Sequence, residues 1–587
     1  MKAFPTFARA IQDVVPAEEK IHSESDKEAG VQVKNDNANF EGLTPEFQRG
    51  IQKMQATTQV WSTTHMVLAY INIWVIYFVT ALQGTMSGAL TPYVTSSFQE
   101  HSLTATVSIV SSLMSGLCIL PLAKIVDIWG RPNGFICSVV LSTVGLVMMA
   151  ACKNVETYAA AQVFYGIGQT GVNFALTLFI ADTSQLKNRG LMFAFVSSPY
   201  IATVWCGGPA AESFLKHGGF RWGFGTFSIV LPAVCLPLWG LFVWNYRKAK
   251  KAGLIPEEKS GRTFAESFKY YAIEFDIVGI FLIAAGMALF LLPFSLYSYQ
   301  KDQWRSPMII AMILVGGLLV IAFALWERYG APKKYMPFEL LADRTVLGAC
   351  ILAAVLFVEF YIWDSYFSSF LQVVNNLTVT EASYVVNIYS IGSCFWALVV
   401  GALIRVTGRF KWIALYFGVP LTILGVGLML KFRQPDSPLG YIIMCQIFIA
   451  FSGGSLVICE QVAVMAATTQ QYIAVVIAME NVFTYTGGAI GSTIAGAIWT
   501  GVFPKRLVEY LPAESQGNFT SIYGDLTMQL SYPVGSPTRI AIQDAYGEAQ
   551  KMMIIAATAV LAIALVCVAL WRDIKVKDFR QVTGNVI

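Results

Sequence analysis

The chain has 587 residues, of which 56% are hydrophobic and 13% are charged. Soluble domains carry about 25% charged residues, so this composition and a mean hydropathy of +0.58 exclude an ordinary soluble globular protein. The formal net charge of +4 is too small to indicate a nucleic-acid partner.

The first 65 residues are polar, and Lys, Glu, Asp and Asn are scattered through them. The apolar core of a cleaved signal peptide would lie much nearer the start of the chain, so we expect none. A segment with so few apolar residues is predicted to be disordered, and we interpret residues 1–65 as a cytosolic tail.

Fourteen apolar runs follow, each near the length of about 20 residues that spans a bilayer. Chain inside lipid must satisfy its own backbone hydrogen bonds, so each run is expected to form a helix. The predicted spans are residues 66–86, 103–123, 134–152, 158–181, 190–212, 222–245, 275–296, 307–326, 346–369, 382–404, 412–430, 440–462, 472–500 and 552–571.

The distribution of Lys and Arg orients these spans. With the N-terminus in the cytosol, 29 of the 40 Lys and Arg residues lie in inside segments and 11 in outside loops, as the positive-inside rule requires. In this assignment no Lys or Arg lies deep in a span. Two N-x-[ST] sequons, at Asn376 and Asn518, fall on outside loops, where glycosylation can occur.

A short pattern occurs twice at a constant offset of 278 residues. It reads AKIVDIWGR at 123–131, after the second span, and GALIRVTGR at 401–409, after the tenth. In both copies a small residue and a charged residue precede Gly-Arg. Parallel repeats of this kind build the two halves of the major facilitator fold.

The first copy, Asp127-x-x-Gly130-Arg131, resembles the signature that major facilitator transporters carry between helices 2 and 3, although Ala123 replaces the family's first Gly. A carboxylate and a guanidinium at a helix end can form a charge-assisted latch, which would close one face and break when the halves rock. The candidate latch residues are Asp127, Gly130, Arg131, Arg405 and Arg409. The alternative is a Gly-Arg turn that only places a cation at the interface.

The resemblance implies an all-α membrane protein with the major facilitator fold, in which two six-helix bundles flank two extra central helices to give 14 transmembrane helices. The predicted organisation is a disordered cytosolic tail (1–65), an N-terminal six-helix bundle (66–245), a basic cytosolic loop with the two extra helices (246–326), a C-terminal six-helix bundle (327–571) that includes a long extracellular loop (501–551), and a cytosolic tail (572–587).

Further runs resemble fungal siderophore–iron transporters of this superfamily, and the resemblance covers nearly the whole chain after residue 60. They are Ser97-Phe98-x-x-His101-Ser102-Leu103, Asp127-Ile128-Trp129-Gly130-Arg131-Pro132, Gly207-Gly208-Pro209 and Asp544-Ala545-Tyr546-Gly547. The resemblance implies a monomeric importer of ferric siderophores, driven by proton symport, in the lipid bilayer of the plasma membrane. An endosomal or vesicular membrane is the alternative location.

The fourth span carries a polar stripe that is expected to face a substrate. Gln162, Gln169 and Asn173 are spaced by 7 and 4 residues, which places them on one helix face, and polar groups in lipid are expected to face the bundle interior. Gln162 stands where many superfamily members have an Arg, which puts their Arg-based coupling scheme in doubt. The first span adds candidates that either line the same cavity or belong to an interfacial aromatic belt: Tyr70, Asn72 and Trp74.

Carboxylates inside spans indicate a functional site, and we interpret four of them as candidates for proton coupling. They are Glu359, Asp364, Glu460 and Glu480. The alternative is that some are paired structural groups or lie in a water-filled vestibule, and we expect two of the four to matter for transport. Tyr361 and Trp363 of the ninth span are candidate substrate contacts between the first two carboxylates.

The outer loop at 501–551 is rich in aromatic and aliphatic residues, unlike a disordered linker. We expect it to fold over the outer vestibule and to contact the incoming chelate. The candidate contacts are Tyr532, Arg539 and Tyr546. The alternative is a packed cap with no ligand role.

No metal site or cofactor is expected, because the four His residues lie outside the spans and no His, Cys and carboxylate set has metal-ligand spacing. Iron would therefore arrive already wrapped in a chelator, and a hydroxamate chelate suits aromatic walls with a few amide donors. An enzyme is not expected, since no nucleophile–base pair, P-loop or dinucleotide fingerprint is present. The alternative functions are a multidrug exporter working by proton antiport and a non-transporting nutrient sensor.

Overall fold

The computed structural model describes residues 60–97, 104–128, 130–253, 263–297, 300–332, 338–468 and 472–578. All of them belong to one unit of the chain, residues 44–587. The regular secondary structure in these ranges is helical, as the sequence predicts. Only the last six residues of the expected N-terminal tail are described, and the C-terminal tail is described as far as residue 578.

Six predicted spans make up the N-terminal bundle. Their helices are α3 (Thr63–Ser97), α4 (Thr104–Ile128), α5 (Arg131–Ala151), α6 (Val155–Thr183), α7 (Leu186–Ser197) continued by α8 (Pro199–His217), and α9 (Phe220–Lys251). The break between α7 and α8 falls directly before Pro199, which has no backbone N–H to donate to the preceding turn.

The C-terminal bundle has the same number of spans. Its helices are α15 (Arg344–Asp364) continued by α16 (Phe367–Val373), α17 (Val379–Val386) continued by α18 (Ile388–Thr407), the short α19 (Lys411–Ile413) continued through a π-helical turn, Ala414–Gly418, by α20 (Val419–Phe432), then α21 (Leu439–Ala466), α22 (Ile473–Tyr510) and α25 (Pro537–Leu570).

The two extra helices form an antiparallel pair of their own, preceded by α10 (Phe264–Glu274). The second member, α13 (Pro307–Leu325), spans without interruption, whereas the first is divided into α11 (Ile277–Leu291) and α12 (Pro293–Leu296). Leu292 between them keeps helical dihedrals, with φ −60 and ψ −35, so the chain direction is maintained. Thirteen helices in the described ranges are long and apolar enough to cross a membrane, and α11 is the shorter fourteenth.

The predicted outer loop, residues 501–551, differs from expectation in its extent. α22 continues to Tyr510 and α25 already begins at Pro537, so both helices extend beyond the apolar runs that revealed them. The chain between them folds into a 3-10 turn (Ala513–Asn518), α23 (Phe519–Gly524) and α24 (Leu526–Ser531). The aromatic and aliphatic residues of this segment therefore pack as short helices.

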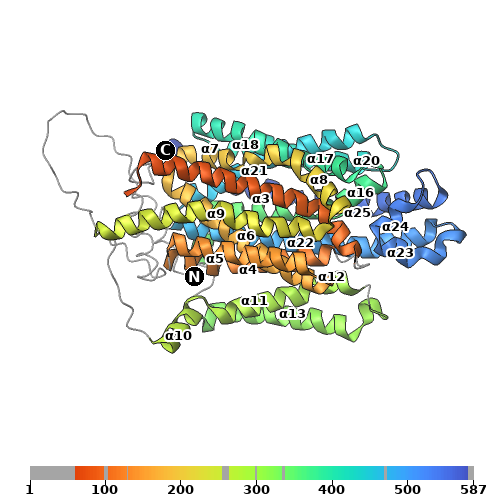
Figure 1. Ribbon diagram of the computed structural model, residues 1–587, viewed down its shortest axis with the longest axis horizontal. Coiled ribbons are helices and arrows are strands. Elements are labelled where there is room, and N and C mark those ends of the chain that lie inside the picture. The colour runs from red at the N-terminus through yellow and green to blue at the C-terminus, as the bar shows by residue number, and fades with distance from the viewer. Residues whose placement is uncertain are drawn as a thin grey trace. The chain divides into compact units, whose positions relative to one another are not determined.

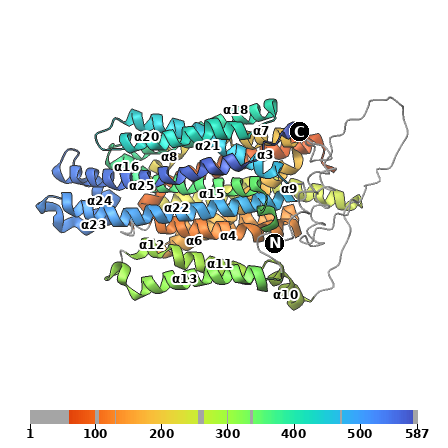
Figure 2. The same cartoon turned by 180° about the vertical axis from the view of Figure 1, so that it is seen from behind.

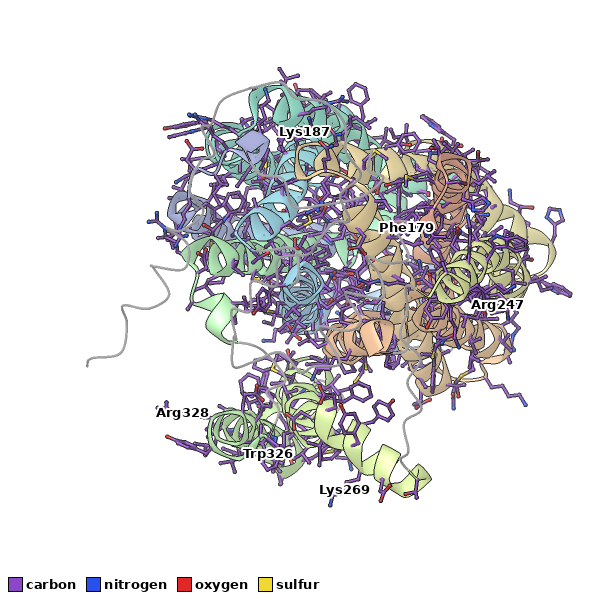
Figure 3. All side chains as sticks on the ribbon, turned by 90° about the vertical axis from the view of Figure 1, so that its left-hand side faces the viewer. Phe179, Lys187, Arg247, Lys269, Trp326 and Arg328 are labelled. Atoms are coloured by element: carbon purple, nitrogen blue, oxygen red, sulfur yellow. The ribbon has the colours of Figure 1, made fainter. Side chains whose placement is uncertain are left out.

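The helices run side by side, and α11 and α13 lie along one flank next to α4 and α22 (Figure 1). The view from behind shows the same flank and places α23 and α24 at one end of the bundle (Figure 2). Figure 3 looks onto the opposite end and labels four of its cationic residues, Lys187, Arg247, Lys269 and Arg328. This is the end that the positive-inside rule assigns to the cytosol.

The two bundles approach each other closely along two seams. One seam packs α4 against α22, and the other packs α7 and α8 against α17 and α18. A Cβ atom on Gly401 would lie 2.9 Å from the Leu191 Cα, and one on Gly208 would lie 2.9 Å from the Ser383 Cβ. Small residues at these points let the helix backbones meet, so the second seam is tight at both of its ends.

Candidate functional site

The polar stripe of α6 lies on a half-buried face near the C-terminal bundle. Gln162 Nε2 donates to the Tyr158 hydroxyl at 2.8 Å, and Gln169 Nε2 donates to Asn173 Oδ1 at 3.4 Å. On the same helix Thr170 donates to the Tyr485 hydroxyl of α22 at 2.7 Å. Thr170, next to this stripe in the sequence, therefore joins α6 to the other bundle.

The three candidates on α3 have different surroundings. The Tyr70 hydroxyl shares a hydrogen bond of 2.8 Å with Thr183 and its ring is buried. Trp74 donates its indole N–H to Ser198 at 3.0 Å. Asn72 Oδ1 is buried with no hydrogen-bond partner among the described residues. Tyr70 thus stabilises the bundle from within, whereas Asn72 keeps an acceptor for another group.

Gln83, further along α3, also contributes a buried amide. Its Nε2 donates to Ser87 at 2.8 Å, and its Oε1 accepts a hydrogen bond from the Tyr165 hydroxyl of α6. The contact joins the polar residues of α3 to those of α6. Both helices therefore contribute amides and hydroxyls to one interior region of the N-terminal bundle.

The interior of the C-terminal bundle is aromatic and charged around the outer end of α15. Trp363 is fully buried and donates its indole N–H to Glu359 Oε1 at 2.7 Å. Phe360 lies between Trp363 and Tyr389 of α18, with ring centroids 5.2 Å and 5.3 Å away. Glu359 is therefore held by a hydrogen bond inside an aromatic cluster.

Tyr361 packs edge-on against Phe360 of that cluster, with ring centroids 5.5 Å apart, and also reaches the seam between the bundles. A Cβ atom on Gly488 of α22 would lie 3.0 Å from its ring, and its hydroxyl interacts with Ser112 of α4. Tyr361 is thus the predicted substrate contact of α15 that touches a helix of each bundle.

Arg433, at the end of α20, is a functional candidate that sequence reasoning missed. It was expected in an outside loop, yet it is fully buried and its Nη2 donates to the Trp363 carbonyl at 2.9 Å. Asp364 is its charged neighbour. The signal in the sequence was weak, because one Arg next to the end of an apolar run usually lies at the interface.

The other two candidate carboxylates, Glu460 of α21 and Glu480 of α22, are buried nearer the inner end. They interact electrostatically with each other, and Glu460 Oε2 has no hydrogen-bond partner among the described residues. Two buried like charges repel strongly. This arrangement can hold a proton between two helices, in contrast to Glu359, which is bonded to an indole.

The latch candidates lie at the inner end, but with partners the sequence did not predict. Arg131 pairs with Asp182 at the end of α6, at 3.3 Å, and Arg409 pairs with Asp573, also at 3.3 Å. Asp127 lies in the last turn of α4, and its side chain falls outside the description. The Arg of each Gly-Arg turn therefore forms an ion pair with an Asp at or just beyond the end of another helix.

The glycines of these turns have a conformational role. Gly130 has φ 88 and Gly408 has φ 74, a region that residues with a Cβ rarely enter. Arg405 is exposed in the last turn of α18, where a cation interacts favourably with the helix dipole. The repeated pattern thus ends one helix and sets the direction of the next in both bundles.

The outer candidates are buried within the packed outer segment. Arg539 donates to the carbonyls of Gln529 and Gln372, at 2.5 Å and 3.3 Å. Tyr546 is fully buried and donates to Gln529 Oε1 at 2.8 Å, and the half-buried Tyr532 accepts from the Asn518 amide at 3.4 Å. In this conformation Arg539 and Tyr546 hold the segment onto the bundle.

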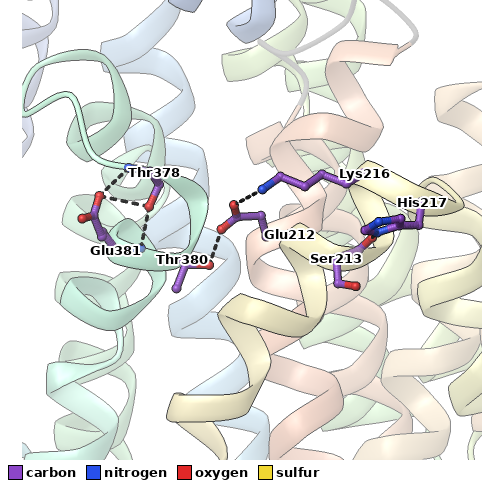
Figure 4. Close-up of polar contacts among 7 residues, drawn as sticks. All are labelled: Glu212, Ser213, Lys216, His217, Thr378, Thr380 and Glu381. Carbon is purple, nitrogen blue, oxygen red and sulfur yellow. Dashed lines mark hydrogen bonds and ion pairs between the residues drawn. The ribbon is translucent and has the colours of Figure 1, made fainter.

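The outer ends of the two bundles are joined by several hydrogen bonds. Glu212 of α8 accepts from Lys216 at 2.7 Å and from the Thr380 hydroxyl of α17, as Figure 4 shows. Tyr93 of α3 donates to Gln372 Oε1 at 2.6 Å. These contacts link the bundles at the outer end, while the Gly401 contact closes the seam at the inner end.

The two sequon residues differ in their surroundings. Asn376 has φ 56 and its Oδ1 accepts a hydrogen bond from Arg539 at 3.2 Å. Asn518 is exposed at the start of α23. The Asn518 side chain is therefore the more accessible of the two to a modifying enzyme.

The described residues hold no group of three or more His, Cys, Asp or Glu side chains that could bind a metal ion. All ten cysteines are free thiols. Among the described residues, the N-terminal bundle presents amides and hydroxyls in its interior, and the C-terminal bundle presents aromatic rings and buried charges.

Comparison with known proteins identifies the family. The family model for the Major Facilitator Superfamily matches residues 73–335. Relatives include "MFS siderochrome iron transporter 1" of Ajellomyces capsulatus, 66% identical with 93% of both chains covered. "Siderophore iron transporter mirB" of Emericella nidulans is 45% identical, with 97% of this chain and 94% of the relative covered.

Solved structures share the fold at low sequence identity. A bacterial homologue of the human lysosomal transporter Spinster, inward-facing and occupied, gives a TM-score of 0.53 at 14% identity, covering 87% of this chain and 97% of that chain. A peptide transporter, POT, gives 0.51 at 14% identity, covering 89% and 99%.

The fold and the polar interior define a multi-pass membrane transporter rather than an enzyme. The chain belongs to the major facilitator superfamily and, within it, to the family of the siderophore iron transporters named above.

Proposed function

We propose that this protein imports ferric siderophores across a membrane. The observation that carries the proposal is the identity of 66%, over nearly the full length of both chains, to a protein named as a siderochrome iron transporter. The same class of name belongs to the relative that is 45% identical. Iron is the cargo and is bound inside its chelator, so the protein needs no metal ligands of its own.

The finer proposal is a hydroxamate chelate as the substrate. Such a chelate presents amide-like carbonyls and an apolar skin, and binding sites for such ligands combine aromatic walls with a few placed polar groups. Thr170, beside Gln169, and Tyr361 contact the opposite bundle, and the amides Gln162, Gln169 and Asn173 are the polar contacts that we assign to the chelate. Asn72 supports the same site with its unpartnered acceptor.

We further propose that proton symport drives import. The support is the set of carboxylates inside the bundle, and the residues assigned to proton transfer are Glu359, Asp364, Glu460 and Glu480. A proton that enters from outside would neutralise one of them and so lower the cost of exposing it to the low-dielectric interior when the bundles move. The expected location is the plasma membrane.

The experiment that tests the function is uptake of radiolabelled iron on a panel of hydroxamate and non-hydroxamate chelates, by cells that express the chain and by cells that do not. Expression should raise cell-associated iron for the hydroxamates, and a protonophore at constant ATP should abolish the rise. Efflux of dyes or drugs without any change in chelate uptake would favour the multidrug exporter instead.

A further inference from the structure

Arg433 combines three features that ask for an explanation. It ends α20 as its C-cap residue, and it is fully buried. Its guanidinium carbon lies 4.1 Å from the centre of the Phe367 ring and 5.3 Å from that of Phe370. The one hydrogen bond that its side chain makes among the described residues runs from Nη2 to the Trp363 carbonyl.

These contacts do not compensate a buried guanidinium. Nε and Nη1 have no hydrogen-bond partner among the described residues. Aromatic faces attract a cation, and a carbonyl accepts one hydrogen bond, but burying a charge is costly unless a counter-charge is near. Arg433 therefore needs a carboxylate, and it retains two nitrogen donors that can bind one.

Asp364 is that carboxylate. It follows Trp363 directly, and its charge interacts with that of Arg433, although no direct ion pair between the two is formed in this conformation. The other titratable groups that face Asp364 are Glu359 and Tyr361 of α15 and Tyr389 of α18. None of these is a cation, and Glu359 already accepts the Trp363 indole N–H.

The pair sits at a break in the span. α15 ends at Asp364 and α16 begins at Phe367, while Tyr366 between them leaves the helical region with φ −122 and ψ 18. Arg433 contacts both sides of this break, because its Nη2 binds the Trp363 carbonyl and its guanidinium covers the Phe367 ring. A move of the guanidinium would change how the two segments of the span are held together.

We propose that Arg433 is the counter-charge of Asp364, and that the direct ion pair between them forms and breaks during transport at the hinge between α15 and α16. When Asp364 is ionised, Nε and Nη1 of Arg433 bind its carboxylate. When a proton from outside joins that carboxylate, the ion pair breaks and the guanidinium, still charged, returns to the Trp363 carbonyl and the Phe367 ring. This last step rests on the proposed proton symport; the charge pairing does not.

The test is a double-mutant cycle on the stability of the purified full-length protein. Arg433→Gln leaves the half-buried Asp364 charge without a partner, so it should lower the unfolding temperature at neutral pH. The deficit should shrink as the pH falls, because protonation removes the unpaired charge. Asp364→Asn combined with Arg433→Gln should restore most of the loss, and Arg433→Lys should lose less than Arg433→Gln.

A matched control distinguishes charge pairing from packing. Arg539 is also buried, but its donors reach the carbonyls of Gln529 and Gln372 and the Asn376 amide oxygen. Asp364→Asn should not restore the stability that Arg539→Gln removes. If Arg433→Gln cannot be purified, recovery of folded protein in the double variant supports the pair, and failure of the double variant overturns it.

The proposal is also overturned if the effects of Asp364→Asn and Arg433→Gln simply add, or if the Arg433→Gln deficit is the same at every pH. The cycle uses neither a siderophore nor a proton gradient. Its failure would leave the proposed function intact, and a failure of uptake would leave the charge pair intact.

Discussion

The interiors of the two bundles differ in chemistry. In the N-terminal bundle the interior groups of α3 and α6 are amides and hydroxyls, joined through contacts such as that between Tyr165 and Gln83. In the C-terminal bundle α15, α21 and α22 carry buried carboxylates, and α20 ends in a buried guanidinium. Charges in the N-terminal bundle, such as Asp182 and Glu212, lie instead toward helix ends, and its fully buried Arg189 lies in the first turn of α7.

The difference indicates a division of roles. Neutral hydrogen-bonding groups can hold a chelate without a large desolvation cost, because each side chain exchanges a water for a substrate oxygen. Buried charges respond to protons and to each other, and they are costly to leave unpaired. We therefore expect changes in the C-terminal bundle to affect energy coupling and changes in the N-terminal bundle to affect substrate affinity.

The largest effect is expected from the carboxylates. Glu359→Gln, Asp364→Asn and Glu480→Gln should each preserve chelate binding while reducing accumulation against a gradient, because the amide cannot carry a proton. The measurement is iron accumulation in cells beside equilibrium binding to membranes, with surface level as the control. Normal accumulation by all three variants would contradict the assignment of coupling to this bundle.

The next largest effect on transport is expected from a substitution in the tight seam between the bundles. A methyl group on Gly401 would lie 2.9 Å from the Leu191 Cα, so Gly401→Ala should force the inner ends apart and slow transport at unchanged surface level. Gly427→Ala on α20 is the matched control, since its methyl group would meet no atom within 4 Å. Equal transport rates for the two variants would exclude a role for this close approach.

Substitution of the amides in the N-terminal bundle should have a smaller effect, on substrate affinity and not on the transport rate. Loss of a neutral hydrogen bond costs about 0.5–1.5 kcal/mol, so Gln162→Ala and Gln169→Ala should each raise the half-saturation concentration about 2- to 10-fold. The maximal rate should change little, because neither residue carries charge. A fall in the maximal rate with unchanged half-saturation would instead place these amides in coupling.

Loss of the Arg131–Asp182 ion pair should change the transport rate least. The Arg131–Asp182 pair is partly exposed, with 17% and 16% of the two side chains accessible, and such ion pairs contribute about 0–1 kcal/mol. Arg131→Gln should therefore reduce the transport rate less than about 5-fold, and more at low salt than at high salt. An effect as large as that of the carboxylates would mean that this contact controls the change between conformations.

The helices followed from the sequence, because hydropathy acts locally along the chain. The orientation that the position of Lys and Arg predicts stays a prediction. The seventh span is an instructive exception. Its composition is apolar enough, but Pro293 divides it into α11 and α12, and hydropathy does not register the missing backbone donor.

Burial by distant segments could not be predicted in the same way. Arg433 and the end of α15 are about 70 residues apart in the chain, so nothing near Arg433 reveals the aromatic rings that cover it. The same holds for Asp182, whose partner Arg131 lies on another helix. Sequence patterns show which residues are costly to bury, but only the packing shows which contacts compensate the burial of each one.

Proton-driven import of a ferric siderophore can be measured with the purified protein in proteoliposomes, with an imposed pH gradient and a labelled ferric hydroxamate outside. If protons drive the import that we propose, uptake requires the gradient to be acidic outside, and the outer medium becomes more alkaline when the chelate is added. Uptake of equal rate and extent without any gradient, with no proton movement, would contradict proton-driven import.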